Sequence, residues 1–226
     1  QISLAVTAPK ARIIDKAFKD KQVAPKVMVV ILGGLLMGLL IPFALIYLFE
    51  LFDNKIKSKH DIEKISNTIP IIGEVPQLEK GDNELVKMND MSPLAESLRI
   101  LITNMNFMVG KKKGKVVFVT STVKGEGKTF VSVNLGLTIA SPNKKTIIIG
   151  ADIRNPQLQR YNEERKGLKG LTEFLYEDSL DYKTLVHKSI YNQYLDVMYS
   201  GSIPPNPTDL LSNGKFENLI QELSQH

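Results

Sequence analysis

The sequence predicts an α/β domain with a parallel sheet flanked by helices, preceded by one transmembrane helix. Three observations lead to this prediction. An apolar run without any charge covers the 23 residues from Val27 to Phe49. Further along the chain, β-branched runs alternate with helical patterns, which is typical of parallel sheets. A glycine-rich segment at residues 122–129 joins the first of these runs to the helix that follows it.

The apolar run between Lys26 and Glu50 is long enough to cross a membrane. At a rise of about 1.5 Å per residue it spans a hydrocarbon core of about 30 Å. A buried core helix rarely stays apolar on every side for so long. A signal peptide would be shorter and would end in small residues at a cleavage site. We therefore expect a transmembrane helix over residues 27–52.

The overall composition excludes some classes of protein. The chain has 226 residues, a formal net charge of +5 and no cysteine. Without cysteine there is no disulfide framework. The basic residues flank the apolar run or lie in expected loops, and they form no basic face with interleaved aromatic residues. We therefore expect no nucleic-acid partner.

The segment from Thr122 to Thr129 has the pattern of a P-loop, although Thr122 replaces the usual first glycine. We expect a strand before it, Val116–Thr120, and a helix after it, from Phe130 to Ala140. Glycines let a backbone turn its amides toward phosphates, and the N-terminus of the helix adds partial positive charge. The ligand expected is ATP with Mg²⁺. The candidate nucleotide-binding residues are Val123, Lys124, Gly125, Glu126, Gly127, Lys128, Thr129 and Phe130.

Two side chains of the loop and one acid beyond it are the candidates for the reaction itself. We expect Lys128 to bridge the β- and γ-phosphates and the Thr129 hydroxyl to bind Mg²⁺. Asp152 follows a second expected strand, Thr146–Ile149, and an acid at that position can bind Mg²⁺ through water. The alternative is that Asp152 caps the next helix. The candidate catalytic residues are Lys128 and Asp152, and the candidate metal ligands are Thr129 and Asp152.

Four parts of the chain are expected. They are residues 1–26, the membrane helix 27–52, a linker and helix over 53–110, and the nucleotide-binding domain 111–226. Within the linker, Ser92 and Pro93 mark the start of a helix, and the charged stretch from Lys80 to Asp90 is expected to be mobile. A third strand is expected at Leu195–Tyr199, followed by a helix from Thr208.

Chemistry decides the expected orientation in the membrane. Lysine and arginine are plentiful on both sides of the apolar run, so the positive-inside rule does not choose between orientations. ATP and Mg²⁺ are cytoplasmic, so the nucleotide-binding domain should face the cytoplasm and residues 1–26 should lie outside. In a bacterium this is the inner, cytoplasmic membrane. The chain also lacks an initiator methionine, and we expect it to be a fragment of a longer protein.

The motifs in this order resemble the bacterial tyrosine kinases (BY-kinases) of capsule and exopolysaccharide export. That family fuses a chain-length-regulating membrane module to a cytoplasmic P-loop kinase related to the ParA and MinD ATPases. The resemblance covers nearly the whole chain. It rests on Ala24-Pro25-Lys26, Gly73-Glu74-Val75-Pro76, the stretch Pro93 to Arg99, the loop Lys124 to Thr129, the stretch Ala151 to Pro156, and Gly201 to Pro207.

The resemblance implies ATP-dependent autophosphorylation on tyrosine, in trans, within a ring of identical subunits. It also implies that Lys128 and Thr129 bind the phosphates and Mg²⁺, and that Asp152 holds the metal through a water molecule. The implied partners are the lipid bilayer, further copies of the chain, the polysaccharide polymerisation and export machinery, and a tyrosine phosphatase.

Three departures from the family pattern bear on activity. Gly150 stands where the family has the first acid of an acid-x-acid-x-arginine motif, which removes a candidate base for the accepting tyrosine. Ile102 replaces the last arginine of the Glu-x-x-Arg-x-x-Arg helix that is associated with ring assembly. The chain ends at His226, before any further strand ending in aspartate (the Walker B element) and before a tyrosine-rich tail. We therefore expect this fragment alone to be inactive.

Two other functions remain open at this point. One is a polysaccharide chain-length regulator that binds nucleotide but has no kinase activity, and the glycine at position 150 favours it. The other is a ParA/MinD-type ATPase that positions cargo on membranes. The apolar run argues against the second, and so does Val123, which stands where those ATPases carry a lysine.

Overall fold

The computed structural model describes residues 24–53, 55–66, 68–110 and 114–225. The chain divides between Ile62 and Glu63 into two compact units, which are described separately. Most of the expected extracytoplasmic segment 1–26 lies outside the described residues.

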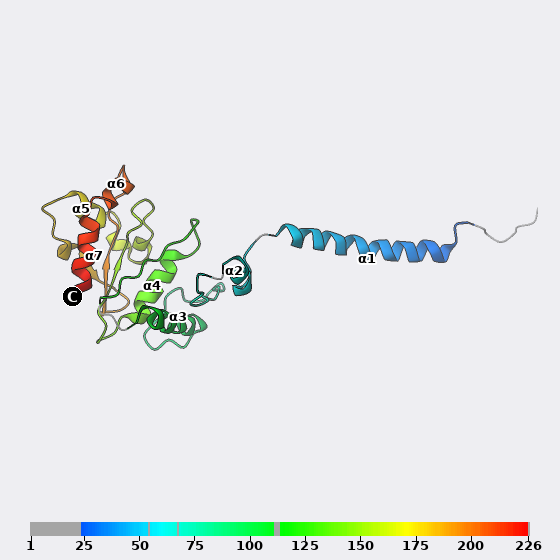
Figure 1. The fold of residues 1–226 in the computed structure, drawn as a ribbon, viewed down its shortest axis with the longest axis horizontal. Helices are drawn as coiled ribbons and strands as arrows, with labels where there is room; N and C mark the ends of the chain where they lie inside the picture. Colours follow the sequence, from blue (N-terminus) through cyan, green and yellow to red (C-terminus); the bar gives the residue numbers. More distant parts are fainter. Residues whose placement is uncertain (1–23, 54, 67, 111–113, 226) are drawn as a thin grey trace, which may run out of the picture. The chain divides into compact units, whose positions relative to one another are not determined.

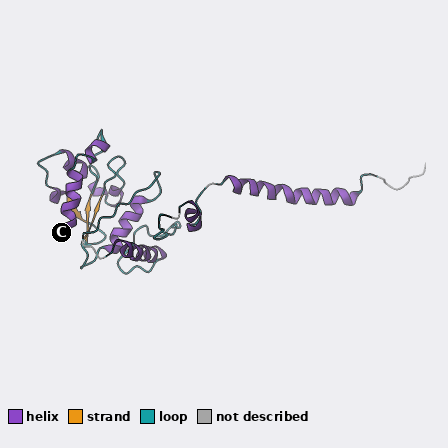
Figure 2. Ribbon diagram, in the orientation of Figure 1, coloured by secondary structure: helices purple, strands orange, loops and turns teal. Residues whose placement is uncertain are grey.

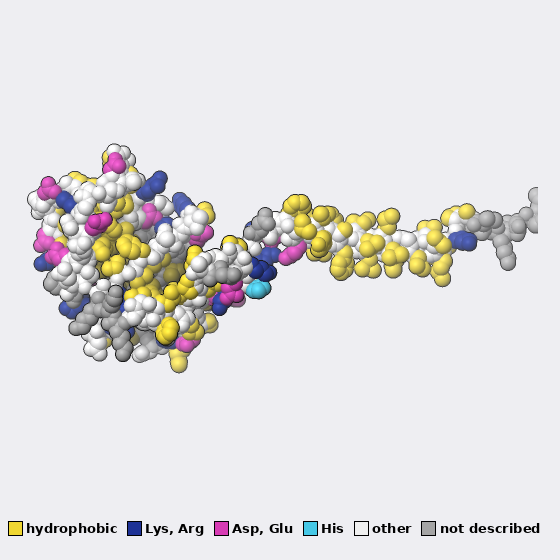
Figure 3. Space-filling view, viewed as in Figure 1, with side chains coloured by type: hydrophobic (Ala, Val, Ile, Leu, Met, Phe, Trp, Pro, Cys, Tyr) yellow, Lys and Arg dark blue, Asp and Glu magenta, His cyan; other side chains and the backbone are white. Residues whose placement is uncertain are grey.

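In the described part of the first unit there is one long helix, α1, from Val27 to Phe52 (Figure 1). Apolar side chains surround it, and none of its residues is buried against protein (Figure 3). Its length and composition are sufficient to cross a membrane. The helix begins and ends where the sequence predicted. A short helix, α2, follows from Lys59 to Ile65.

The second unit is built around a three-stranded sheet in the order β1-β3-β2 (Figure 2). Strands β1 (Thr146–Ile149) and β3 (Leu195–Met198) are parallel, with Thr146 opposite Leu195 and Ile149 opposite Met198. Both strands were predicted. The antiparallel strand β2 (Val186–Lys188) was not, because three residues give too little periodicity to detect.

Successive residues of β1 point to opposite faces of the sheet, as expected for a strand. Ile148 packs against Val133 and Leu137 of helix α4 (Lys128–Ile139). Ile147 and Ile149 pack on the other face, against a second cluster. That cluster is contributed by α5 (Leu171–Tyr176), η3 (Tyr182–Leu185) and α7 (Lys215–Gln225). Helices therefore cover both faces (Figure 1), and this confirms the predicted architecture. The remaining elements are η1 (Leu158–Tyr161), η2 (Glu163–Arg165) and α6 (Pro207–Leu211).

Helix α4 approaches the sheet closely because it carries a glycine at the contact. A Cβ atom at Gly136 would lie 2.6 Å from Ile148 Cδ1 and 3.3 Å from Leu195 Cδ1. A side chain at this position would require the Ile148 side chain to shift or the helix to move away from β1. The phosphate loop is therefore attached to a helix whose distance from the sheet is fixed by packing.

Helix α3 runs from Pro93 to Val109 and begins as predicted. The Ser92 hydroxyl accepts a hydrogen bond from the Ala95 amide at 3.2 Å, and Pro93 occupies the first turn. Leu94, Ala95 and Leu98 form a third apolar cluster, which also contains Val86 and the Phe130 ring of α4. The prediction of a mobile connector over 80–90 is therefore wrong at Val86, in the middle of that stretch, since Val86 is 7% exposed and packed.

The strand predicted at Val116–Thr120 is the main error of the sequence analysis. These residues are not paired with any strand among the described residues, and Phe118 is 72% exposed. A strand is stabilised by hydrogen bonds to a neighbour, and no other segment of the described part of the chain supplies one here. The β-branched composition was read correctly as β-favouring, but composition alone does not provide a partner.

Candidate nucleotide site

The phosphate loop takes the conformation that its glycines were expected to allow. Gly125 has φ 95° and Gly127 has φ 90°, both in the left-handed region. A Cβ atom would meet nothing within 4 Å at either position, so the backbone conformation, and not lack of space, requires glycine. The loop is closed by Glu126, whose carboxylate accepts a hydrogen bond from the Val123 amide at 3.1 Å.

Helix α4 begins at Lys128, with Gly127 as its N-cap and no side chain capping its first amides. The N-terminal amides of a helix without a capping side chain are available to an anion, and the helix dipole favours negative charge there. Thr129 and Phe130 follow in the first turn. The sequence prediction placed the helix start two residues later, at Phe130.

The two candidate catalytic residues meet in the structure. Lys128 Nζ lies 2.9 Å from Asp152 Oδ2, across 24 positions of sequence. The contact forms because Asp152 follows the carboxyl end of β1 while α4 packs on the face of that strand. Ligands of open α/β sheets bind at this edge of the sheet. The structure thus brings these two side chains together at the end of β1.

Asp152 is held by two kinds of contact. Its Oδ1 accepts a hydrogen bond from the Asn155 amide at 3.0 Å, and its Oδ2 pairs with Lys128. Burial raises the pKa of the Asp152 carboxyl, but the Lys128 ammonium and the Asn155 amide together lower that pKa below its usual value. The alternative that Asp152 caps the next helix is not supported, because Gln157 is the N-cap of η1.

The donor set at this place suits a metal that is bound mainly by phosphate and water. Within the described ranges, no three acidic, histidine or cysteine side chains lie close enough together to hold a metal ion by themselves. One hydroxyl, from Thr129, and one carboxylate, from Asp152, match the way Mg²⁺ is held beside a triphosphate. Mg²⁺ there keeps several waters and needs only one or two protein ligands. The residues present therefore fit this metal as a partner of nucleotide.

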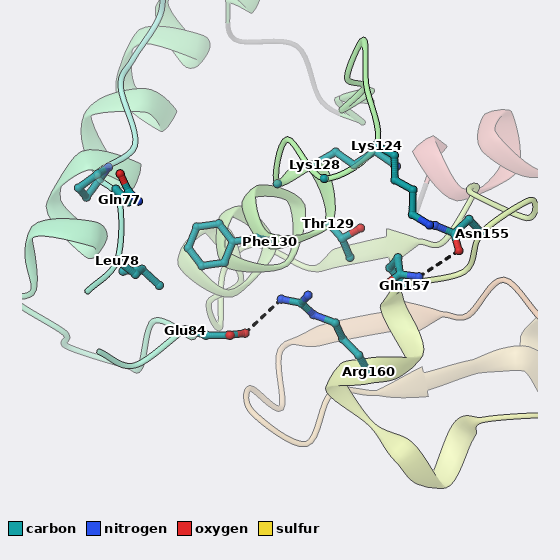
Figure 4. A pocket seen from close by; sticks show the side chains of 13 residues that line it. Gln77, Leu78, Glu84, Lys124, Lys128, Thr129, Phe130, Asn155, Gln157 and Arg160 are labelled. Atoms are coloured by element: carbon teal, nitrogen blue, oxygen red, sulfur yellow. Dashed lines mark hydrogen bonds and ion pairs between the residues drawn. The ribbon is translucent and has the colours of Figure 1, made fainter. Parts of the chain in front are cut away.

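A pocket of about 380 Å³ opens beside the loop (Figure 4). Its floor is formed by the loop and the first turn of α4. Its walls include Leu78 and Glu84 from the linker, and Gln157 and Arg160 from the segment after Asp152. Glu84 Oε2 and Arg160 Nη2 form an ion pair of 3.1 Å across the pocket (Figure 4).

The linker residues of this pocket were missed by sequence reasoning. Glu84 and Arg160 are 76 positions apart, and no local pattern relates them. Phe130 was predicted to bind nucleotide, and it does line the pocket. Its ring also packs in the apolar cluster with Leu94 and Leu98, so part of its role is to join α4 to α3.

The glycine at position 150 is packed tightly against the end of β3. A Cβ atom there would lie 2.6 Å from Ser200 Oγ and 3.1 Å from the Ser200 amide nitrogen. Ser200 is 1% exposed, and its hydroxyl has no hydrogen-bond partner. The departure at position 150 is therefore more than a missing carboxylate, because Ser200, two residues after β3, occupies the adjacent space.

The other departure lies on α3. Arg99 pairs with Glu96 at 3.1 Å and also donates to the Asp90 carbonyl. Ile102, which replaces an arginine of the family pattern, is partly buried one turn further on. The exposed Glu96–Arg99 pair contributes little to stability, about 0.3–0.5 kcal/mol.

Comparison with known proteins assigns the chain to a family, although no family model matches it. It is 28% identical to tyrosine-protein kinase ptk of Acinetobacter johnsonii, over all of this chain and 32% of that protein. It is 36% identical to tyrosine-protein kinase CpsD of Streptococcus pneumoniae, over 54% of this chain and 52% of CpsD. The chain thus spans about a third of the length of the first curated relatives that it matches.

A solved structure extends the likeness to the fold. The BceF tyrosine kinase domain superposes with a TM-score of 0.62 at 30% identity, covering 75% of this chain and 72% of that domain. The superposed part must include most of the second unit, because the first contains 62 of the 226 residues. With the loop, the Lys128–Asp152 pair and these likenesses taken together, the chain belongs to the family of bacterial tyrosine kinases (BY-kinases).

Proposed function

We propose that this chain is the membrane-anchored, ATP-binding part of a protein-tyrosine kinase that autophosphorylates and regulates exopolysaccharide or capsule polymerisation and export. The observation that supports this most directly is the 2.9 Å contact between Lys128 and Asp152 at the end of a glycine loop. Lysine, loop amides and an acid at the strand end are the groups that phosphoryl transfer requires.

Each of these groups has a distinct task in the proposed reaction. The loop amides and the N-terminus of α4 bind the phosphates of ATP. Lys128 neutralises charge on the β- and γ-phosphates, and to do so it exchanges Asp152 for phosphate oxygen. The γ-phosphoryl group passes from ATP to a tyrosine hydroxyl, which loses its proton, and ADP leaves. Because the transition state needs mainly positioning and charge neutralisation, few further protein groups are required.

Mg²⁺ is the proposed metal of the site. The Thr129 hydroxyl would hold it directly, and Asp152 would hold one of its waters. When bound, it neutralises charge on the transferring phosphoryl group. Asp152 is ionised at neutral pH at its ordinary pKa, and the ionised carboxylate is the form that attracts a hydrated cation.

The proposed topology follows from helix α1. With α1 in the inner membrane, the second unit faces the cytoplasm, where ATP is available, and residues 1–26 lie outside. Phosphorylation in trans requires further copies of the chain, and a ring of subunits is the proposed assembly. The polysaccharide machinery and a tyrosine phosphatase are the proposed partners.

Replacement of Lys128 tests the kinase proposal. In cells that produce the full-length protein, Lys128→Met should remove phosphotyrosine, because methionine has a similar length but no charge for the phosphates. The measurement is an anti-phosphotyrosine blot at equal protein level. Lys145→Met, at an exposed position before β1, is the matched control and should leave the signal unchanged. Undiminished phosphotyrosine in Lys128→Met would refute the kinase assignment.

The packing of Gly150 favours a second candidate function, a chain-length regulator in which nucleotide controls assembly without phosphorylation. With Ser200 filling the space beside position 150, the loop after β1 offers Asp152 as its one carboxylate. A full-length protein that binds ATP but carries no phosphotyrosine would establish this function. Steady ATP hydrolysis without phosphotyrosine would instead indicate an ATPase of the ParA/MinD type.

A further inference from the structure

Asn134 is a fully buried polar residue within the phosphate-loop helix. It lies in the second turn of α4, six positions after Lys128, and is 0% exposed. Its side-chain oxygen accepts a hydrogen bond from the Val86 amide at 2.8 Å. Its nitrogen donates to the carbonyls of Glu84 and Phe130, at 2.9 Å each. A buried amide side chain with both its oxygen and its nitrogen satisfied is in a specific arrangement, since each unmade bond would be costly.

Two of these three bonds leave the helix. They reach residues 84–86 of the linker, which we call the strap, 48 and 50 positions earlier in the chain. Val86 is buried beside α3, so the strap is packed as well as hydrogen-bonded. The Glu84 side chain leaves the strap in another direction and pairs with Arg160 of η1. The strap is thus attached to α4 through Asn134 and to η1 through Glu84.

The two attachments lie on either side of the nucleotide pocket. Helix α4 supplies Lys128, Thr129 and Phe130, and η1 follows the loop that carries Asp152. Figure 4 shows Glu84 and Arg160 meeting at this pocket. The strap contacts both α4 and η1, and through Glu84 it forms part of one wall of the pocket.

We propose that Asn134 is a positioning residue that docks the strap on the phosphate-loop helix and so completes the nucleotide pocket. The inference rests on the proposed function, because it concerns the same site. It adds that the linker between the membrane helix and the kinase fold is part of the pocket. When the strap leaves Asn134, the wall that carries Glu84 leaves with it, and nucleotide is held by the loop alone.

If Asn134 only stabilises α4, its loss should affect nucleotide binding no more than the loss of another side chain that binds α4. Asn192 is such a side chain. The Asn192 side chain donates to the carbonyls of Leu137 and Ala140, at 3.3 Å and 3.1 Å, at the other end of the same helix. None of the hydrogen bonds that its side chain makes in the described structure, to Leu137, Ala140 and Tyr194, reaches the strap. If hydrogen bonds to α4 matter only for helix stability, Asn134→Ala and Asn192→Ala should affect nucleotide binding alike.

The test uses the whole chain in detergent micelles, with a fluorescent ATP analogue plus Mg²⁺ as the probe. In Asn134→Ala, hydrogen exchange of the Val86 amide should become at least about tenfold faster, because its acceptor is gone. The dissociation constant of the analogue should rise about five- to tenfold, because one buried bond that orders the pocket wall is lost. Asn192→Ala should change neither quantity.

A second variant keeps the inference testable if Asn134→Ala folds poorly. Glu84→Gln leaves Asn134 intact and breaks the exposed ion pair with Arg160, so it should fold normally while weakening analogue binding. Wild-type binding in Asn134→Ala, or equal weakening in Asn134→Ala and Asn192→Ala, would overturn the inference while the proposed function stands. Failure of the unsubstituted chain to bind the analogue would refute the proposed function, and the inference with it.

Discussion

The two flanks of the phosphate loop are stabilised in opposite ways. After the loop, α4 packs Val133 and Leu137 into the core and is hydrogen-bonded by Asn134 and Asn192. Before the loop, residues 116–119 are between 36% and 72% exposed and belong to no sheet among the described residues. The position of the loop is therefore set from its helix side.

The two flanks are equally recognisable in the sequence, but they contribute differently to the stability of the folded chain. A β-branched run before the loop and a helix after it are equally visible in the sequence. Only the helix contributes buried apolar surface and satisfied buried amides, which are the larger stabilising terms. A substitution on the helix flank should therefore cost much more than a similar one on the strand flank.

The largest expected effect comes from shortening a core side chain of α4. Leu137 is 7% exposed, and Leu137→Ala should lower the free energy of unfolding by about 2–5 kcal/mol. Val117→Ala on the other flank, where the side chain is 44% exposed in the structure, should change it by about 0.5 kcal/mol or less. Urea unfolding of the chain in micelles, followed by tyrosine fluorescence, measures both. All the tyrosines except Tyr47 lie in the second unit.

One result of this experiment would contradict the proposed difference between the two flanks. A loss in Val117→Ala comparable to that in Leu137→Ala would mean that residues 116–119 are packed in solution. In that case the strand flank would support the loop as well as the helix does.

The carboxyl end of β1 should be packed as tightly as α4, and a substitution of Gly150 tests this. Gly150→Asp introduces the acid of the family pattern at a place where Ser200 already lies. We expect a destabilisation of about 1–3 kcal/mol from overpacking, and no gain of phosphotyrosine in the full-length protein. Because Ser200 Oγ is the nearest obstacle, at 2.6 Å, the double variant Gly150→Asp with Ser200→Gly should recover part of the stability.

A stable Gly150→Asp variant with increased phosphotyrosine would contradict this expectation. It would show that the end of β1 tolerates a substitution at as little cost in stability as the exposed strand flank does. The same unfolding assay and an anti-phosphotyrosine blot provide the two readouts.

The parts of the fold that the sequence predicted are those that depend on local physics. The span of α1 follows from its uncharged length, and the start of α3 follows from Ser92 and Pro93. The positive φ angles of Gly125 and Gly127 follow from the loop motif. The meeting of Lys128 and Asp152 followed from topology, since an acid after a parallel strand lies at the edge where the loop lies.

The parts that it missed depend on partners far away in the chain. Residues 116–120 have the composition of a strand, but composition does not reveal whether a neighbour is present. The strap and Arg160 join the pocket through contacts over 48 to 76 positions, which no periodicity encodes. The stretch before Val86 resembles a mobile linker because it is charged. The burial of Val86 and the two hydrogen bonds from Asn134 to the backbone of residues 84 and 86 outweigh that composition.

The smallest expected effect concerns the Asp152–Lys128 pair, which stands where the helix flank meets β1. The pKa of Asp152 is lower in the folded chain than its value of about 3.9 in the unfolded chain. A carboxyl with a lowered pKa in the folded state stabilises that state above the unfolded pKa, and the contribution is lost as pH falls through the folded pKa. The stability difference between the unsubstituted chain and Asp152→Asn should therefore shrink between pH 5 and pH 3. Urea unfolding at low salt measures it, and a difference that stays constant or grows toward pH 3 would show that Lys128 does not hold Asp152 ionised.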